Sequence, residues 1–266
     1  MAGVQAAAPL LFTVEFRRKM AQLPLHERRD WLASLAVRVR EAPPSNELAQ
    51  EMREVARGCR LPLVDSIQAQ LGPFDALLLR AVLEVPRERF VRLDDLERSA
   101  DDTPLPLDDE GHATISAPHA YLLSFRLLEL GPGDALVELG SGSGYGAALA
   151  AFIVGAQGRV RSFEIDRRLA AWAARNLEGT GNVSVVHADA TGSAPAWEGT
   201  RKVVVTYAVT DIPAVWADAL PEGGRLVAPV GMRDRDQLLV MLRRLDGRVL
   251  RTEHGAVRYV ADRSGR

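Results

Sequence analysis

A glycine-rich turn between two apolar segments is the part of this sequence with the clearest chemical meaning. Residues 137–145 read Val-Glu-Leu-Gly-Ser-Gly-Ser-Gly-Tyr. Glycine allows a tight turn and lets a ligand approach the backbone N–H groups closely. If residues 135–139 form a buried parallel strand, this turn lies at the strand's carboxyl end, where such sheets bind ligands. The pattern predicts a binding site whose candidate residues are Gly140, Ser141, Gly142, Gly144 and Tyr145.

The spacing of the glycines differs from the dinucleotide-binding pattern. That fingerprint is G-x-G-x-x-G/A, with its third small residue at the helix start, and Tyr145 occupies that position here. The acid Glu138 precedes the turn by two residues. A carboxylate at this point disfavours a pyrophosphate and favours a cationic or zwitterionic ligand.

Further acids lie at the ends of the next two expected strands. Glu164 lies 20 residues past Gly144, where nucleotide-binding α/β folds place an acid on the ribose. Asp189 and its neighbour Ala190 follow the third strand, and the Asp189 carboxylate can accept a hydrogen bond from a base amino group. With Glu138, this set suits S-adenosylmethionine. The alternatives are a NAD or FAD enzyme and a nucleotide fold that has lost its ligand.

Strand-like and helix-like segments alternate over the second half of the chain, which predicts a mostly parallel sheet covered on both faces. Helices are expected over 121–130, 145–154, 168–177 and 212–220. Strands are expected over 135–139, 158–165, 183–187, 202–206, 225–229, 237–245 and 249–259, the last two joined by a hairpin at Asp246-Gly247. The fold class is therefore α/β, with a Rossmann-like seven-stranded sheet.

The first 75 residues contain no strand-like run and are predicted to be helical. Helices are expected over 23–39, 46–59 and 63–71, with another over 74–84 that Pro86 ends. We interpret residues 1–75 as a helical N-terminal extension and 76–266 as the main domain. The extension is either a packed subdomain or a region that contacts a partner or the substrate. Residues 92–110 are acidic and are predicted to be a loop.

The composition excludes several classes of protein. The 33 basic and 35 acidic residues give a net charge of −2, so no nucleic-acid partner is implied. Cys59 is the only cysteine, which rules out an internal disulfide and a cysteine-rich zinc site; we expect no metal. No window approaches the ~18 apolar residues that span a bilayer, and no basic region precedes the apolar residues 4–14. We expect a cytoplasmic protein.

Several segments together resemble the protein-L-isoaspartate (D-aspartate) O-methyltransferase family. The similarity extends over residues 78–262. The segments that carry it are 85–91 (VPRERFV), 114–119 (TISAPH), 138–145, 223–231 (GGRLVAPVG) with Gln237 after it, and 257–260 (VRYV). The resemblance implies a methyltransferase domain that uses S-adenosyl-L-methionine to methylate the α-carboxylate of isoaspartyl residues in damaged proteins. The ester then collapses to a succinimide, and hydrolysis returns part of the material to aspartate.

The resemblance also implies which residues hold the acceptor. Ser116 matches the family's active-site hydroxyl, and Thr114 is expected to assist it. A carboxylate acceptor, with a reference pKa near ~4, is already ionised at pH 7 and needs no general base. Catalysis is then mainly a matter of orientation, which can supply several kcal/mol.

The chain departs from the family's pattern in several places. Ala188 and Ala190 replace glycines after the third strand, and Arg92 stands where the family often has proline. Lys202 replaces an acid at the start of the fourth strand, Tyr207 is bulkier than usual, the acidic loop is longer, and the extension is long. Three readings stay open: an isoaspartyl repair enzyme, a relative that methylates aspartate in a dedicated peptide to form an aspartimide, and a non-catalytic cofactor-binding adapter. In the second reading the extension recognises the peptide.

Overall fold

The computed structural model describes residues 22–41, 46–190, 200–232 and 235–262, which form two compact units. The helical unit comprises residues up to 73 together with 82–102, and the sheet unit comprises 74–81 and 103 onward. The apolar residues 4–14 lie outside the described residues. No helix in the described ranges is both long enough and apolar enough to cross a membrane.

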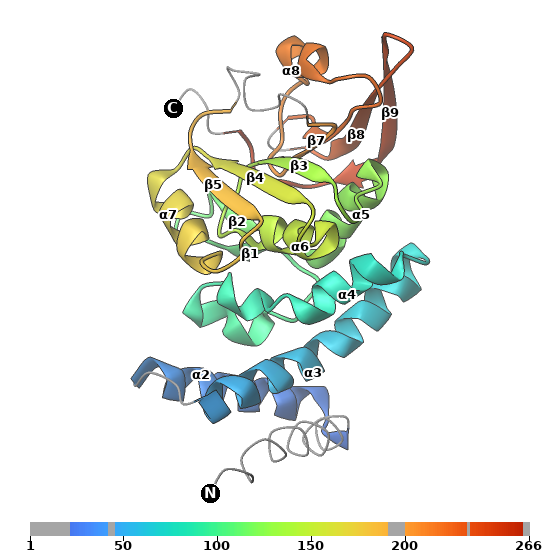
Figure 1. Ribbon diagram of the computed structural model, residues 1–266. Coiled ribbons are helices and arrows are strands. Elements are labelled where there is room, and N and C mark those ends of the chain that lie inside the picture. Colours follow the sequence, from blue (N-terminus) through green and yellow to red (C-terminus); the bar gives the residue numbers. More distant parts are fainter. Residues whose placement is uncertain (1–21, 42–45, 191–199, 233–234, 263–266) are drawn as a thin grey trace, which may run out of the picture. The chain divides into compact units, whose positions relative to one another are not determined.

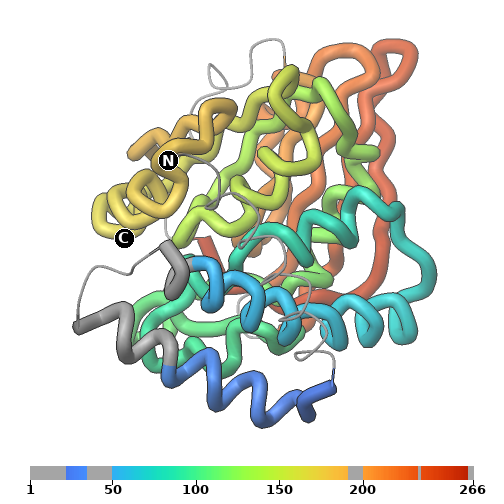
Figure 2. Tube along the Cα trace, turned by 60° about the horizontal axis from the view of Figure 1, so that its bottom comes forward, coloured from blue at the N-terminus to red at the C-terminus, as the bar shows by residue number. Residues whose placement is uncertain are grey.

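Two helices form most of the helical unit. They are α2 (Leu25–Glu41) and α3 (Asn46–Leu71), which lie side by side (Figure 2). Leu32 of α2 packs against Val55 and Ala56 of α3, and all three are buried. The buried Arg60 guanidinium of α3 donates to the Glu88 carboxylate at 2.7 Å and to the Leu83 carbonyl. It thereby links α3 to the last turn of α4 (Ala76–Glu84) and to the segment that follows.

The structure corrects the predicted break between residues 59 and 63. Helix α3 continues through Pro62. Proline has no N–H, so the carbonyl four residues earlier loses its helical donor. That carbonyl belongs to Gly58, and the Arg28 side chain of α2 donates to it at 2.7 Å. The packing of two helices thus supplies the hydrogen bond that the local sequence cannot.

The sheet unit contains the predicted seven-stranded sheet, in the order β5-β4-β3-β6-β7-β8-β9. The first five strands in this order are parallel, whereas β8 pairs antiparallel with both β7 and β9. The strands are β3 (Ala135–Leu139), β4 (Arg159–Glu164), β5 (Val183–His187), β6 (Lys202–Val205), β7 (Arg225–Val230), β8 (Gln237–Leu245) and β9 (Arg248–Val257).

Helices cover both faces of this sheet. On one side lie α5 (Pro118–Leu128), α6 (Tyr145–Val154) and α7 (Arg167–Asn176), and on the other lies α8 (Ala214–Ala219) (Figure 1). A separate small sheet pairs β1 (Leu105–Pro106) with β2 (Thr114–Ile115). The prediction that 92–110 is all loop was therefore wrong: the range contains β1 and a short 3₁₀ helix, Leu93–Arg98, because the apolar Leu96 and Leu105 are buried.

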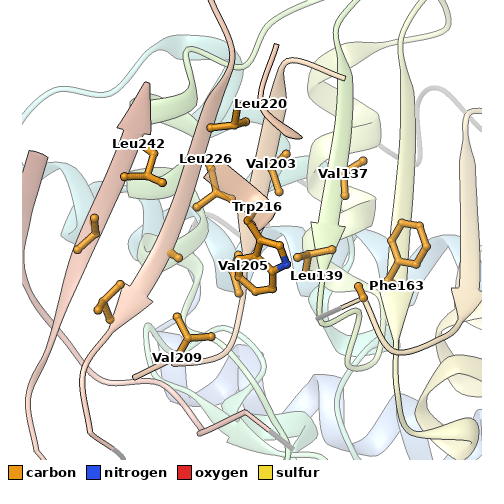
Figure 3. Packing of buried hydrophobic residues seen from close by; sticks show 14 residues of the cluster. Val137, Leu139, Phe163, Val203, Val205, Val209, Trp216, Leu220, Leu226 and Leu242 are labelled. Carbon is orange, nitrogen blue, oxygen red and sulfur yellow. The ribbon is translucent and has the colours of Figure 1, made fainter. Parts of the chain in front are cut away.

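Trp216 of α8 is the centre of the core on its side of the sheet. Its side chain is fully buried and lies against Val205 and Leu139 (Figure 3). Successive residues of a strand point to opposite faces. Val137 and Leu139 of β3 therefore belong to this cluster, while Glu138 between them points toward α5 and α6.

Candidate active site

A cavity opens where the strand order of the sheet reverses. Strand β3 pairs with β4 on one side and with β6 on the other, so the crossovers on its two sides diverge, and such switch points bind ligands at the carboxyl ends of the strands. The cavity holds about 730 Å³ of space, including the solvent at its open mouth. Its lining comes from the carboxyl ends of β3, β4, β5 and β6 and the residues after them, from β2 with the residues just before it, and from residues 260–262. Tyr121 of α5 and Leu169 of α7 complete it.

The glycine turn after β3 forms one wall of this cavity. Gly140, Ser141 and Gly142 line it, as predicted. The backbone N–H groups of Gly140 and Ser141 both donate to the Phe163 carbonyl, at 2.8 and 3.0 Å. Gly140 has φ +98°, and a Cβ there would lie 2.9 Å from a ring carbon of Tyr207. The turn therefore requires glycine at this position for both its conformation and its space.

Glu164, Asp189 and Ala190 also line the cavity, as their positions after β4 and β5 predict. The Glu164 carboxylate is fixed by two backbone donors. Its Oε2 accepts from the Gly142 N–H at 2.8 Å, and its Oε1 accepts from the Asp166 N–H at 3.0 Å. The residue is 6% exposed, so the carboxylate is held rigidly at the cavity wall.

Glu138 lies behind the glycine turn, and it does not line the cavity. Its side chain is 1% exposed, and its carboxyl accepts a hydrogen bond of 2.5 Å from the Ser162 hydroxyl. Ser162 is in turn 2.5 Å from the hydroxyl of Ser141, which lines the cavity. Burial raises the pKa of Glu138 to about 8, the Glu164 charge adds to this rise, and the Ser162 bond opposes it.

Gly144 and Tyr145 likewise stand behind the cavity wall. Tyr145 begins α6, is buried, and packs edge-on against Tyr121 with ring centroids 5.6 Å apart. Gly144 has φ +95° and precedes the helix as its N-cap. These two residues position the turn and α6, and neither belongs to the cavity lining.

The two residues proposed to hold the acceptor differ in their access to the cavity. Thr114 lines the cavity. Ser116 does not; it is buried, and its side chain and backbone are hydrogen-bonded to the phenol of Tyr121, which does line the cavity. Sequence reasoning missed Tyr121, although its position on α5, five residues after Ser116, was a usable signal. It also did not single out further lining residues, among them His112, Phe163, Leu169, Ala261 and Asp262.

The departures from the family differ in whether they reach this cavity; Ala188 and Ala190 line it. Tyr207 lines it as well. Lys202 begins β6 at the amino end of the strand and binds the Asp134 carboxylate and the Glu129 carbonyl there. Because the cavity is at the carboxyl ends of the strands, the change at Lys202 does not alter its wall.

A glycine turn at the switch point and an acid at the end of the neighbouring strand define a Rossmann-like α/β protein that binds a nucleoside-containing cofactor. The family model for protein-L-isoaspartate(D-aspartate) O-methyltransferase matches residues 63–265, and the chain belongs to this family.

Individual relatives agree with this assignment. The protein-L-isoaspartate O-methyltransferase of Methanopyrus kandleri is 38% identical over 210 residues, which are 78% of this chain and 92% of the relative. That of Pyrobaculum arsenaticum is 36% identical over 201 residues, which are 74% of this chain and 95% of the relative. A solved protein-L-isoaspartate O-methyltransferase has a TM-score of 0.69 and 28% identity, covering 76% of this chain and 65% of its own.

A second structure shares the fold. It comes from Plasmodium falciparum, was solved in complex with S-adenosyl-L-homocysteine, and has a TM-score of 0.65 and 22% identity, covering 76% of this chain and 97% of its own.

Proposed function

We propose that this protein is an S-adenosylmethionine-dependent methyltransferase that methylates the α-carboxylate of L-isoaspartyl residues in damaged proteins or peptides. One observation carries the proposal: Thr114–Ile115, from the segment that resembles the family's substrate-side motif, lines the same cavity as the glycine turn. A methyl donor and its acceptor would meet there. The methyl ester then closes to a succinimide, and hydrolysis returns part of the material to aspartate.

The charges on the cavity wall suit a cationic cofactor. Glu164, Asp189 and Asp262 contribute carboxyl groups, and the described residues that line the cavity include no Lys or Arg. A pyrophosphate would face like charge here, whereas a sulfonium and an amino group would face opposite charge. The cofactor, when bound, supplies an electrophilic methyl group. We propose that Glu164 holds the ribose hydroxyls, that Asp189 and Ala190 contact the base, and that the residues 140–142 hold the methionine part.

The protein's task at the acceptor is orientation. The acceptor carboxylate is ionised at neutral pH, since its reference pKa is near ~4. No side chain has to remove a proton from the acceptor. Thr114 and the Ser116 region are proposed to hold the carboxylate so that one oxygen points along the line of transfer. Orientation of this kind can supply several kcal/mol.

The helical unit is proposed to contact the protein part of the substrate. The described residues that line the cavity all belong to the sheet unit, and we propose that this unit holds the reacting groups. Leu61 of α3 is 40% exposed. We expect Leu61→Asp to lower kcat/KM for an isoaspartyl protein but not for a short isoaspartyl peptide. Leu250→Asp, at a residue of β9 that is 47% exposed, is the matched control and should change neither.

The cytoplasm is the proposed location. The one thiol, Cys59, is reduced and buried, which fits a compartment where disulfides are rare.

Transfer of labelled methyl groups tests the proposed reaction. The substrates are a synthetic isoaspartyl peptide and its aspartyl twin, and the label should enter only the isoaspartyl peptide as a base-labile ester. Glu164→Ala should abolish labelling at low cofactor concentration and recover part of it at high concentration. Equal labelling of both peptides would contradict the substrate assignment. Labelling of neither peptide by a protein that binds the cofactor would favour a dedicated peptide substrate or an adapter.

A further inference from the structure

Tyr121 occupies the position between Ser116 and the cavity. It is the fourth residue of α5, is 6% exposed and lines the cavity. Ser116, the family-matched hydroxyl, is buried and is not part of the lining. Hydrogen bonds from the Ser116 side chain and backbone reach the Tyr121 phenol oxygen. The Ser116 hydroxyl therefore faces a side chain of the protein.

The ring of Tyr121 is fixed from several sides. It packs edge-on against Tyr145 and is tilted against Phe125 with centroids 6.3 Å apart. A Cβ on Gly146 of α6 would lie 2.6 Å from its Cε1, so α6 approaches this close only because residue 146 is glycine. A ring packed in this way holds its hydroxyl at one place, which is what orientation of an acceptor requires.

The O–H group of the Tyr121 phenol can donate one hydrogen bond toward the cavity. A tyrosine hydroxyl has one O–H donor and can also accept. Both hydrogen bonds with Ser116 lower the pKa of the phenol, as bonds donated to the phenol oxygen do. Burial, with the Glu138 carboxyl nearby, raises the pKa of Tyr121 above its ordinary value, so the phenol keeps its proton at working pH. A neutral donor of this kind attracts an incoming carboxylate.

We propose that Tyr121 donates the hydrogen bond that orients the acceptor carboxylate, and that Ser116 acts behind it by donating to the phenol oxygen. This inference rests on the proposed function. No proton is transferred, because the acceptor is already ionised; Tyr121 contributes a hydrogen bond and a fixed position. In the alternative arrangement, Ser116 contacts the acceptor carboxylate directly and Tyr121 contributes only packing.

Tyr121→Phe is the first test, since it removes the hydroxyl and keeps the ring. Loss of a hydrogen bond to a charged group should lower kcat/KM for an isoaspartyl peptide by roughly 10- to 100-fold. The dissociation constant for S-adenosylhomocysteine and the Tm should change little. Tyr259→Phe is the matched control, because the Tyr259 phenol is also buried, is bonded to Ser124, and belongs to a residue outside the cavity lining; it should leave the peptide kinetics unchanged.

A double-variant cycle separates the two arrangements. If Ser116 acts through Tyr121, Ser116→Ala should lower kcat/KM clearly in the wild-type background. In the Tyr121→Phe background the same substitution should lower kcat/KM by less than about threefold, because the effects of residues that act as a unit are not additive. Full activity of Tyr121→Phe beside an impaired Ser116→Ala would overturn the inference, as would additive losses. A wild-type protein without isoaspartyl transfer would instead refute the proposed function itself, and the role of Tyr121 would fall with it.

Discussion

The stability of a Glu138→Gln variant, measured relative to that of the wild type, should increase as the pH rises. In the unfolded chain this carboxyl loses its proton near its ordinary pKa of 4.5, whereas burial raises the pKa to about 8 in the folded protein. Between these values the folded state binds more protons than the unfolded state. The free energy of unfolding therefore falls as the pH rises from about 4.5 to about 8, and it is constant above that. Glutamine does not titrate, so Glu138→Gln lacks this loss.

The size of the effect follows from the shift. Each unit of pKa corresponds to about 1.4 kcal/mol. Between pH 6 and pH 8 the wild type should lose roughly 2 kcal/mol relative to the variant, since the titration saturates near pH 8. Solvent screening hardly reduces this free-energy difference, because Glu138 is 1% exposed. For a domain of this size roughly 2–4 °C of Tm accompany each kcal/mol, which gives about 4–8 °C.

Thermal unfolding of the cofactor-free protein measures the effect. The Tm of Glu138→Gln minus that of the wild type is recorded at pH 6, 7 and 8, so that contributions from the other titratable groups cancel. The variant can start lower at pH 6, because its amide N–H groups are buried near α6, but the difference should rise with pH. Glu178→Gln, at an exposed residue, controls for the loss of one charge. A Tm difference that is the same at all three pH values would refute the reasoning.

Three further predictions concern the site and its support. Glu164→Ala should raise the dissociation constant of S-adenosylmethionine by about 100-fold, since it removes the carboxylate that is fixed by the Gly142 and Asp166 N–H groups; calorimetry that finds unchanged affinity would contradict its role. Gly146→Ala should lower the free energy of unfolding by about 1–3 kcal/mol because a Cβ there meets Glu138 and Tyr121, and denaturant titration with an unchanged midpoint would argue against that packing. Lys202→Gln should keep kcat/KM for the peptide within about twofold, because its partner Asp134 lies at the amino ends of the strands; a large fall would connect Lys202 to the site.

The elements of the sheet unit were predictable because their ends carry local signals. Apolar runs bounded by glycine or proline give α6 and β3 with the predicted limits. The continuous α3 was not predictable in this way. Local chemistry at Pro62 favours a break, and only the donor that Arg28 brings from another helix satisfies the Gly58 carbonyl.

The site shows the same division between local and tertiary information. The glycine turn and the acids Glu164 and Asp189 line the cavity because all of them lie at the carboxyl ends of parallel strands, a position that the sequence pattern indicates. Glu138 lies within a buried strand, and alternation of side chains sends it to the face covered by α5 and α6. The screening of Ser116 by Tyr121 depends on how α5 packs, which the motif around Ser116 does not encode.

Conversion of a damaged peptide tests the central claim most directly. An isoaspartyl peptide is incubated with the protein and S-adenosylmethionine, and its isoaspartyl, succinimide and aspartyl forms are separated over time. The account predicts that the isoaspartyl form is consumed, that the succinimide appears transiently, and that the aspartyl form accumulates only when both protein and cofactor are present. An unchanged isoaspartyl peptide, beside a protein shown to bind the cofactor, would contradict the account.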